Sequence, residues 1–166
     1  MPKKVFFSFH YENDNWRAAQ VRNMGLVDGS IPAKDNDWEA VKRGGDAAIQ
    51  KWIDGQIAGR VCGIVLIGSA TAGRKWIQYE IGKCWNDSKG LLGIYIHGLK
   101  DVNGFQGKMG NNPFADFTLK NGSVKLSDVV PTYLPPYSAS TDVYAYIKDN
   151  LESWIDHAIR VRNTYS

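Results

Sequence analysis

The stretch Val-Cys-Gly-Ile-Val-Leu-Ile at residues 61–67 is the most apolar segment of the chain. It lacks the alternation of apolar and polar residues that a strand with one face in water shows. A continuous apolar run of this length is typical of a parallel strand that helices cover on both faces. We therefore predict a central strand at residues 61–67 and build the rest of the fold outward from it.

Further short apolar runs and amphipathic segments alternate on both sides of this strand. Strands are predicted to begin near Lys4, Leu26, Val61, Leu91 and Val129, with the first and third in the centre of the sheet. Helices are predicted at residues 16–22, with an Asn or Asp cap, and at 46–58, 75–87 and 143–158. Strand and helix in alternation indicate an α/β fold, a doubly wound, flavodoxin-like sheet of about five mainly parallel strands with helices on both faces.

The remaining segments carry weaker patterns. Residues 30–45 are polar and are predicted to form a long loop. Residues 118–126 contain an Asn-Gly pair and are predicted to form a hairpin. Pro131 places the last strand at an edge of the sheet, because proline cannot donate to a strand ladder.

Composition excludes several classes of protein. The chain has 166 residues, 43% apolar and 22% charged, which fits one globular domain over residues 1–166. The net charge of +3 is scattered, so we expect neither a nucleic-acid nor a membrane partner. No apolar run approaches the roughly 18 to 20 residues that span a bilayer, and the N-terminus turns polar too early for a signal peptide. We therefore expect a cytoplasmic protein. Its two cysteines, Cys62 and Cys84, make neither a disulfide framework nor a zinc site.

The predicted strand ends lack the usual motifs for phosphate or metal binding. There is no Walker loop and no Gly-x-Gly-x-x-Gly, and the turn after the first strand lacks the phosphate nest of a flavodoxin. Gly68-Ser69 stands where a phosphate-accepting receiver has an aspartate. His10, His97 and His157 show no metal-ligand spacing. We therefore expect no metal and no bound cofactor, and a flavin- or phosphate-regulated switch is disfavoured.

The helix after the third strand carries the remaining candidate residues. Its core-facing stripe consists of Ile77, Ile81 and Cys84. Trp76 and Glu80, four residues apart, lie together on the flank of that stripe nearer the strand ends. One interpretation is that Glu80 pairs with Lys83, Lys75 or Arg74 on a solvated face while Trp76 packs. The other is that indole and carboxylate share one border of a ligand site. Spacing alone favours the first interpretation.

Five segments in one order resemble a known family. Residues 5–9, Val-Phe-Phe-Ser-Phe, and residues 69–80, with a Ser-containing turn followed by Trp76-x-x-x-Glu80, resemble a TIR domain. With residues 45–54, 65–68 and 91–97, the chain is similar to the TIR-like subfamily found as the ThsB component of Thoeris anti-phage systems. The resemblance covers residues 4–114 and weakens afterwards.

This resemblance implies an activity. Catalytic TIR domains cleave NAD, as substrate, at the nicotinamide–ribose bond. In the Thoeris branch the ADP-ribosyl product becomes a cyclic signal that activates a separate effector. Glu80 matches the catalytic glutamate, and Trp76 matches the aromatic residue that lines the nicotinamide-ribose pocket. Candidates for the opposite wall are Phe7, Ser8, Phe9 and His10. Core packing for Phe7 or Phe9 and helix capping for Ser8 are the alternatives.

The chain departs from the family pattern in three places. Ile77 replaces the cysteine that usually follows the tryptophan. Residues 28–32 lack the proline-glycine loop that many TIR domains use to assemble with other copies, and residues 97–131 are longer than such a domain needs. The alternative function is a non-catalytic TIR-like interaction module that acts by assembly. The presence of both Trp76 and Glu80 favours the enzyme, because a scaffold has no need of that pair.

Overall fold

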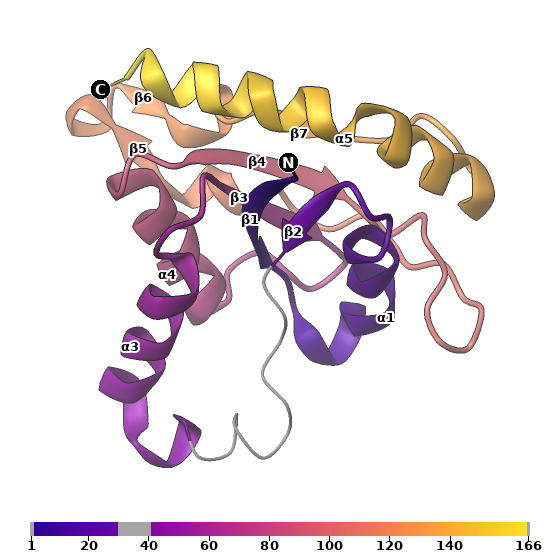
Figure 1. Ribbon diagram of the computed structural model, residues 1–166, viewed down its shortest axis with the longest axis horizontal. Coiled ribbons are helices and arrows are strands. Elements are labelled where there is room, and N and C mark those ends of the chain that lie inside the picture. The colour runs from indigo at the N-terminus through magenta and orange to yellow at the C-terminus, as the bar shows by residue number, and fades with distance from the viewer. Residues whose placement is uncertain (1, 30–40, 166) are drawn as a thin grey trace.

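Five parallel strands in the order β2-β1-β3-β4-β7 form the sheet at the centre of the fold (Figure 1). The structure, a computed structural model, describes residues 2–29 and 41–165. The strands of the sheet are β1 (Lys3–Ser8), β2 (Val27–Gly29), β3 (Cys62–Ile67), β4 (Gly90–Tyr95) and β7 (Thr132–Tyr133). The longer helices are α1 (Tyr11–Arg22), α3 (Gly45–Ile57), α4 (Lys75–Asn86) and α5 (Ser140–Asn163). The predicted α/β, flavodoxin-like architecture is confirmed.

The middle strand of the sheet is β3, as residues 61–67 predict. Every residue of β3 is buried. It pairs with β1 from Val5↔Cys62 to Ser8↔Val65 on one side, and along its full length with β4 on the other. Helices cover both of its faces, which explains why its sequence is apolar throughout.

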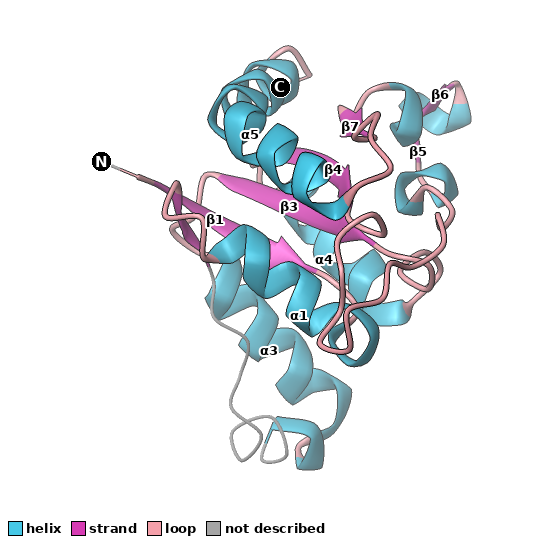
Figure 2. Ribbon diagram, turned by 90° about the vertical axis from the view of Figure 1, so that its right-hand side faces the viewer, coloured by secondary structure: helices cyan, strands magenta, loops and turns pink. Residues whose placement is uncertain are grey.

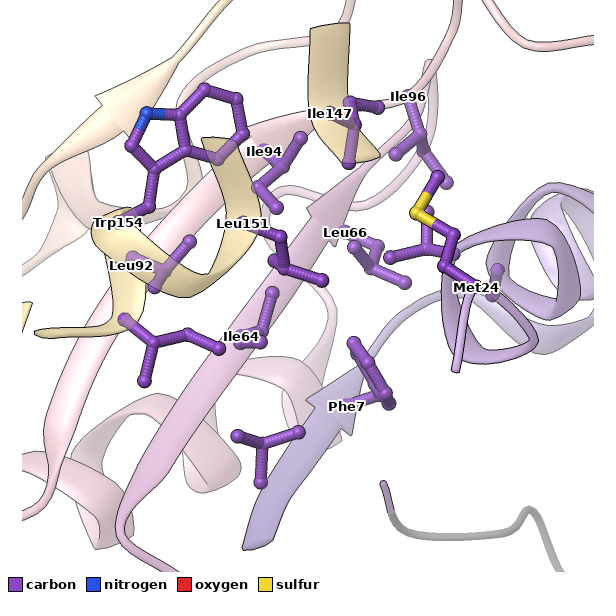
Figure 3. Packing of buried hydrophobic residues seen from close by; sticks show 14 of the residues in the cluster. Phe7, Met24, Ile64, Leu66, Leu92, Ile94, Ile96, Ile147, Leu151 and Trp154 are labelled. Carbon is purple, nitrogen blue, oxygen red and sulfur yellow. The ribbon is translucent and has the colours of Figure 1, made fainter. Parts of the chain in front are cut away.

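Two hydrophobic clusters lie on opposite faces of this sheet. One joins the sheet to α1 and α5, and Figure 3 shows Phe7 and Met24 packed in it beside Ile64 and Leu66. The other joins the sheet to α3 and α4, which lie side by side in Figure 1. Neighbouring strand residues point to alternate faces. Phe7 therefore packs toward α1 and α5, and Phe6 toward α3 and α4.

Helix α1 begins at Tyr11, so the predicted start at residue 16 is wrong. The polar residues before Trp16 resemble a solvated linker in sequence, but Asp14 is buried within the helix. The N-cap residue, directly before the helix, is His10 and not the expected Asn or Asp. Its side chain makes no capping hydrogen bond. Buried polar contacts, and not apolar periodicity, therefore decide where α1 begins.

Outside the main sheet, the predicted hairpin is present, but part of the predicted loop at residues 30–45 is helical. The hairpin is confirmed as β5 (Thr118–Leu119) paired antiparallel with β6 (Val124–Lys125). Short 3₁₀ turns span Pro113–Asp116, Lys120–Gly122 and Leu126–Asp128. Of the loop predicted at residues 30–45, residues 30–40 lie outside the described residues. Residues 41–43 are helical because Val41 packs against the α3/α4 cluster.

Helix α5 packs on the face of the sheet that α1 also covers, and Figure 2 shows it running along the strands. All six of its predicted core positions are buried: Val143, Ile147, Leu151, Trp154, Ile155 and Ala158. The last strand, β7, lies at an edge next to β4, as predicted. It begins at Thr132, after Pro131, so the predicted start near Val129 is wrong. None of the helices formed by residues 2–29 and 41–165 has the length and apolarity needed to cross a membrane.

Candidate active site

Helix α4 places the two main candidate residues at the border of the α3/α4 cluster. The turn before it is closed by Thr71, whose Oγ1 accepts a hydrogen bond from the Gly68 N–H at 2.8 Å. The residues that face the sheet are Ile77, Ile81 and Cys84, all buried. Trp76 and Glu80 lie beside them and are partly exposed, as the sequence predicts.

The Glu80 carboxyl lies in apolar surroundings next to the end of β1. Burial raises the pKa of Glu80 from its ordinary value of 4.5 to about 8, and the Ser8 hydroxyl interacts with the carboxyl and partly offsets the rise. Ser8 Oγ is itself buried and has no hydrogen-bond partner among the described residues, so its contact with the carboxyl is looser than a hydrogen bond. The structure therefore brings together two of the predicted site residues, Ser8 and Glu80.

The basic residues near Glu80 are engaged elsewhere. Lys75 pairs with Asp46, Lys83 pairs with Asp87 at 3.1 Å, and Arg74 Nε donates to the Ala70 carbonyl at 2.7 Å. Among the described residues no ion pair involves Glu80. The interpretation of Glu80 as one half of a surface salt bridge is therefore wrong. A carboxyl group that is desolvated and has no cationic partner has the perturbed pKa that is common at functional sites.

The Trp76 indole lies between two neighbours on its own helix. The ring of Tyr79 meets it edge-on, with ring centroids 5.9 Å apart and planes at 77°. The Lys75 ammonium lies 4.9 Å from the centroid of the indole. The Tyr79 hydroxyl donates to Asp54 Oδ1 on α3 at 2.6 Å. Trp76 is therefore partly exposed yet restrained, and a face of its ring accepts a cation.

The other residues predicted for the opposite wall do not lie together. Phe7 is buried in the α1/α5 cluster, on the face of the sheet away from Glu80. Phe9 packs against the same cluster and stacks on Tyr11 at 6.3 Å. For these two rings the structure supports the alternative of core packing. The alternative that Ser8 caps α1 is wrong, because the N-cap residue of α1 is His10.

A buried polar cluster that sequence reasoning missed lies on the side of α1. Asp14 and Arg17 are 1% and 6% exposed, and the Arg17 guanidinium donates to Asp14 Oδ1 at 3.0 Å. His10 and His97 are close enough to Asp14 to interact electrostatically with its carboxyl group. Burial lowers the pKa of both histidines, and each has a buried Nδ1 with no hydrogen-bond partner among the described residues. In the sequence, the three-residue spacing of Asp14 and Arg17 was the one feature that could have indicated their ion pair, because residues three apart on a helix are neighbours.

Arg17 also joins α1 to the segment that follows β4. Its Nε donates to the Leu99 carbonyl at 2.8 Å and its Nη2 to the Phe105 carbonyl at 2.9 Å. Gly110, later in this segment, packs so closely on the Gly68 carbonyl that a Cβ would stand 2.2 Å from its oxygen. The segment is therefore fixed to α1 and to the turn that leads into α4. No group of three or more His, Cys, Asp or Glu side chains within residues 2–29 and 41–165 could hold a metal ion.

The reactivity of the two cysteines tests whether they are buried in the core. Both thiols are free and buried, and burial raises the pKa of Cys62 and raises that of Cys84 to about 12. Because only the thiolate reacts, we expect no labelling of the folded protein by an aromatic disulfide reagent at pH 8. The same reagent should label both thiols in guanidinium. Labelling of the folded protein at the rate of a free thiol would contradict this picture of the core.

Two comparisons relate this chain to known proteins. A family model described as "Thoeris protein ThsB, TIR-like domain" matches residues 6–101, a range that contains α4 and both Trp76 and Glu80. A protein of Bacillus cereus (strain MSX-D12), named "Putative cyclic ADP-D-ribose synthase ThsB1", is 36% identical over 125 residues. The alignment covers 69% of this chain and 62% of that protein, so the chain spans less than two thirds of its relative.

Proposed function

Because the chain belongs to the TIR-like family of Thoeris ThsB proteins, we propose that it is an NAD-consuming enzyme of anti-phage defence. In this proposal the enzyme acts in the cytoplasm, cleaves the nicotinamide–ribose bond and closes the ADP-ribosyl group into a cyclic ADP-ribose-type signal. The observation that carries the proposal is Glu80, a desolvated carboxyl of the matched region that has no cationic partner among the described residues. The name of the Bacillus cereus relative supports the same class of product.

One carboxylate is enough for this reaction. Glycosidases need a second carboxyl group because their leaving group departs as an alkoxide that must be protonated. Nicotinamide departs from a pyridinium and takes the electron pair of the broken bond, so it leaves as a neutral molecule. The positive charge passes to the ribose ring, where a carboxylate at Glu80 stabilises it. A nucleophile of the same ADP-ribosyl group then bonds to the freed carbon and releases a proton, which Glu80 can accept.

Trp76 supplies the second element of the proposed site. A cation over an indole gains on the order of 0.5 to 2 kcal/mol, and the nicotinamide ring of NAD is cationic. The Lys75 ammonium already lies over this indole, which supports its use as a cation-binding surface. Lys75 is exposed, so a ligand can replace it at low cost. Ser8, which interacts with the Glu80 carboxyl, is the further residue that this proposal assigns to the same ligand.

The partners in this proposal are NAD, other copies of the chain and an effector that the cyclic product activates. The experiment is to incubate the protein with NAD, dilute and concentrated, with and without lysate of phage-infected cells. Mass spectrometry should then detect free nicotinamide and an ADP-ribosyl product lighter than ADP-ribose by one water. If no condition releases nicotinamide, the non-catalytic assembly module takes the place of the enzyme.

The reaction should become faster as the pH rises. Only the ionised form of Glu80 stabilises the ribosyl cation, and with a pKa of about 8 the group is mostly neutral at pH 6.5. We therefore expect kcat/KM for nicotinamide release to rise about 15-fold from pH 6.5 to pH 8 and to level off above pH 9. A Glu80→Gln sample measured beside it corrects for the alkaline decomposition of NAD. A flat wild-type profile across this range would contradict the role of Glu80.

A further inference from the structure

The hydroxyl of Tyr79 ties helix α4 to helix α3 next to the candidate site. It donates to Asp54 Oδ1 at 2.6 Å, a short distance that is typical of a hydrogen bond to an ionised carboxylate. The same contact raises the pKa of Tyr79 to about 12, so the hydroxyl remains a donor at every pH in ordinary use. Helices α3 and α4 pack against each other, so the bond joins two rigid elements (Figure 1).

The ring of this tyrosine is also the aromatic neighbour of Trp76. Residues 76 and 79 are three apart on one helix, and their rings meet edge to face at 5.9 Å, within the range of favourable aromatic pairs. The other restraint on the indole, Lys75, is weaker. That lysine and its partner Asp46 are both exposed, and exposed ion pairs fix side chains poorly.

Core packing does not explain the hydroxyl of Tyr79. The buried residues of α4 are Ile77, Ile81 and Cys84, whereas Tyr79 is partly exposed at the edge of the α3/α4 cluster. A phenylalanine would cover the same apolar surface. The hydroxyl therefore adds one thing, a fixed position for the ring through Asp54 on the neighbouring helix.

We propose that Tyr79, held by Asp54, is a positioning residue that sets the orientation of the Trp76 indole and so the binding of a ligand stacked on that ring. The part concerning the ligand rests on the proposed function, with NAD as the ligand. Neither Tyr79 nor Asp54 touches the reacting atoms in this scheme. Their effect passes through Trp76 and should change KM more than kcat.

The orientation of the indole can be measured without any substrate. The protein is labelled with 5-fluorotryptophan, and the Trp76 resonance is assigned with a Trp76→Phe variant. Tyr79→Phe and Asp54→Ala each break the bond, whereas Asp54→Asn keeps an oxygen that can accept it. We expect the Trp76 resonance to shift and broaden in the first two variants and to return in Asp54→Asn. Trp154, on the other face of the sheet, serves as the internal reference.

The second measurement is the kinetics of nicotinamide release. Tyr79→Phe and Asp54→Ala should raise KM for NAD by about 3- to 10-fold, because the ring at residue 79 is kept but no longer holds the indole in a fixed position, and kcat should change less than about twofold. Asp54→Asn should restore KM. In a Trp76→Ala background, Tyr79→Phe should add nothing further, because the residue that it positions is gone.

The outcomes separate this inference from the proposed function. An unchanged Trp76 resonance in Tyr79→Phe overturns the inference, whatever the enzyme does. A shifted resonance with an unchanged KM overturns its ligand part. If the wild-type protein releases no nicotinamide, the proposed function fails, and the fluorine resonance alone then decides whether Tyr79 positions the indole.

Discussion

Replacing Glu80 with glutamine is expected to lower the rate of nicotinamide release from NAD by about 10²- to 10³-fold. Glutamine keeps the size and the hydrogen-bonding capacity of the side chain but removes the charge that stabilises the ribosyl cation in the proposed reaction. No other acid of α4 can substitute, because Glu80 is the one carboxyl group of this helix. The measurement is the initial rate of nicotinamide release at pH 8.5, where the wild-type carboxyl is largely ionised.

The matched control is Glu152→Gln, the same change at an exposed position of α5. It should release nicotinamide at the wild-type rate. If a folded Glu80→Gln protein also did so, the assignment of Glu80 as the catalytic carboxylate would be wrong, and the assembly module would become the better account of the family membership.

The stability of Glu80→Gln provides an independent test of how Glu80 is buried. The pKa of Glu80 is about 8 in the folded protein, against an ordinary value of 4.5. Below pH 4.5 the side chain is neutral in both states, so the variant should melt close to the wild type. Between pH 4.5 and 8 the unfolded chain loses its proton first, and the wild type loses stability that the variant keeps. We expect the variant to melt several degrees higher at pH 9, as measured by calorimetry.

Replacing Arg17 with methionine is expected to destabilise the fold by about 3 to 5 kcal/mol. Asp14 is 1% exposed, and Arg17 is its partner at 3.0 Å. The substitution would leave a buried carboxylate without a counter-charge, and the Leu99 and Phe105 carbonyls without their donor. For a chain of this size the loss corresponds to a fall in Tm of about 6 to 20 °C.

Two comparisons identify the cause of this loss. Arg43→Met changes an exposed arginine and should leave Tm close to that of the wild type. The double variant Asp14→Asn with Arg17→Met removes both charges and should recover part of the stability. Burial raises the pKa of Asp14, so the deficit of the single variant should also shrink as the pH falls and this carboxyl is protonated. A single variant that melts within about 2 °C of the wild type would contradict this account.

The sequence predicted those parts of the fold that depend on local apolar patterns. Residues 61–67 place β3 in the middle of the sheet, and the spacing of Ile77, Ile81 and Cys84 orients α4. Both signals work because burial of an apolar side chain follows from its own chemistry and from the period of its element. The same reasoning placed Trp76 and Glu80 on the border of the core.

Polar residues that are buried by distant partners could not be predicted in this way. Arg17 binds carbonyls 82 and 88 residues away, and nothing near it in the sequence indicates those partners. The polar stretch before Trp16 was therefore left out of the predicted helix, although it is the first part of α1. The Tyr79–Asp54 bond joins residues 25 apart and was missed for the same reason. The position of Phe7 depends on strand register, which the run of residues 5–9 does not reveal.

The two edges of the sheet limit the ways in which this chain could join other copies of itself. At one edge β2 has three residues, and at the other β7 has two and follows a proline. A long exposed edge strand is a template on which another molecule can add a strand, and this is a route to aggregation. Within residues 2–29 and 41–165, edges this short offer almost no backbone for that purpose. A functional filament of this chain would have to be held together by its helices and loops, and growth by strand addition is suppressed at both ends of the sheet.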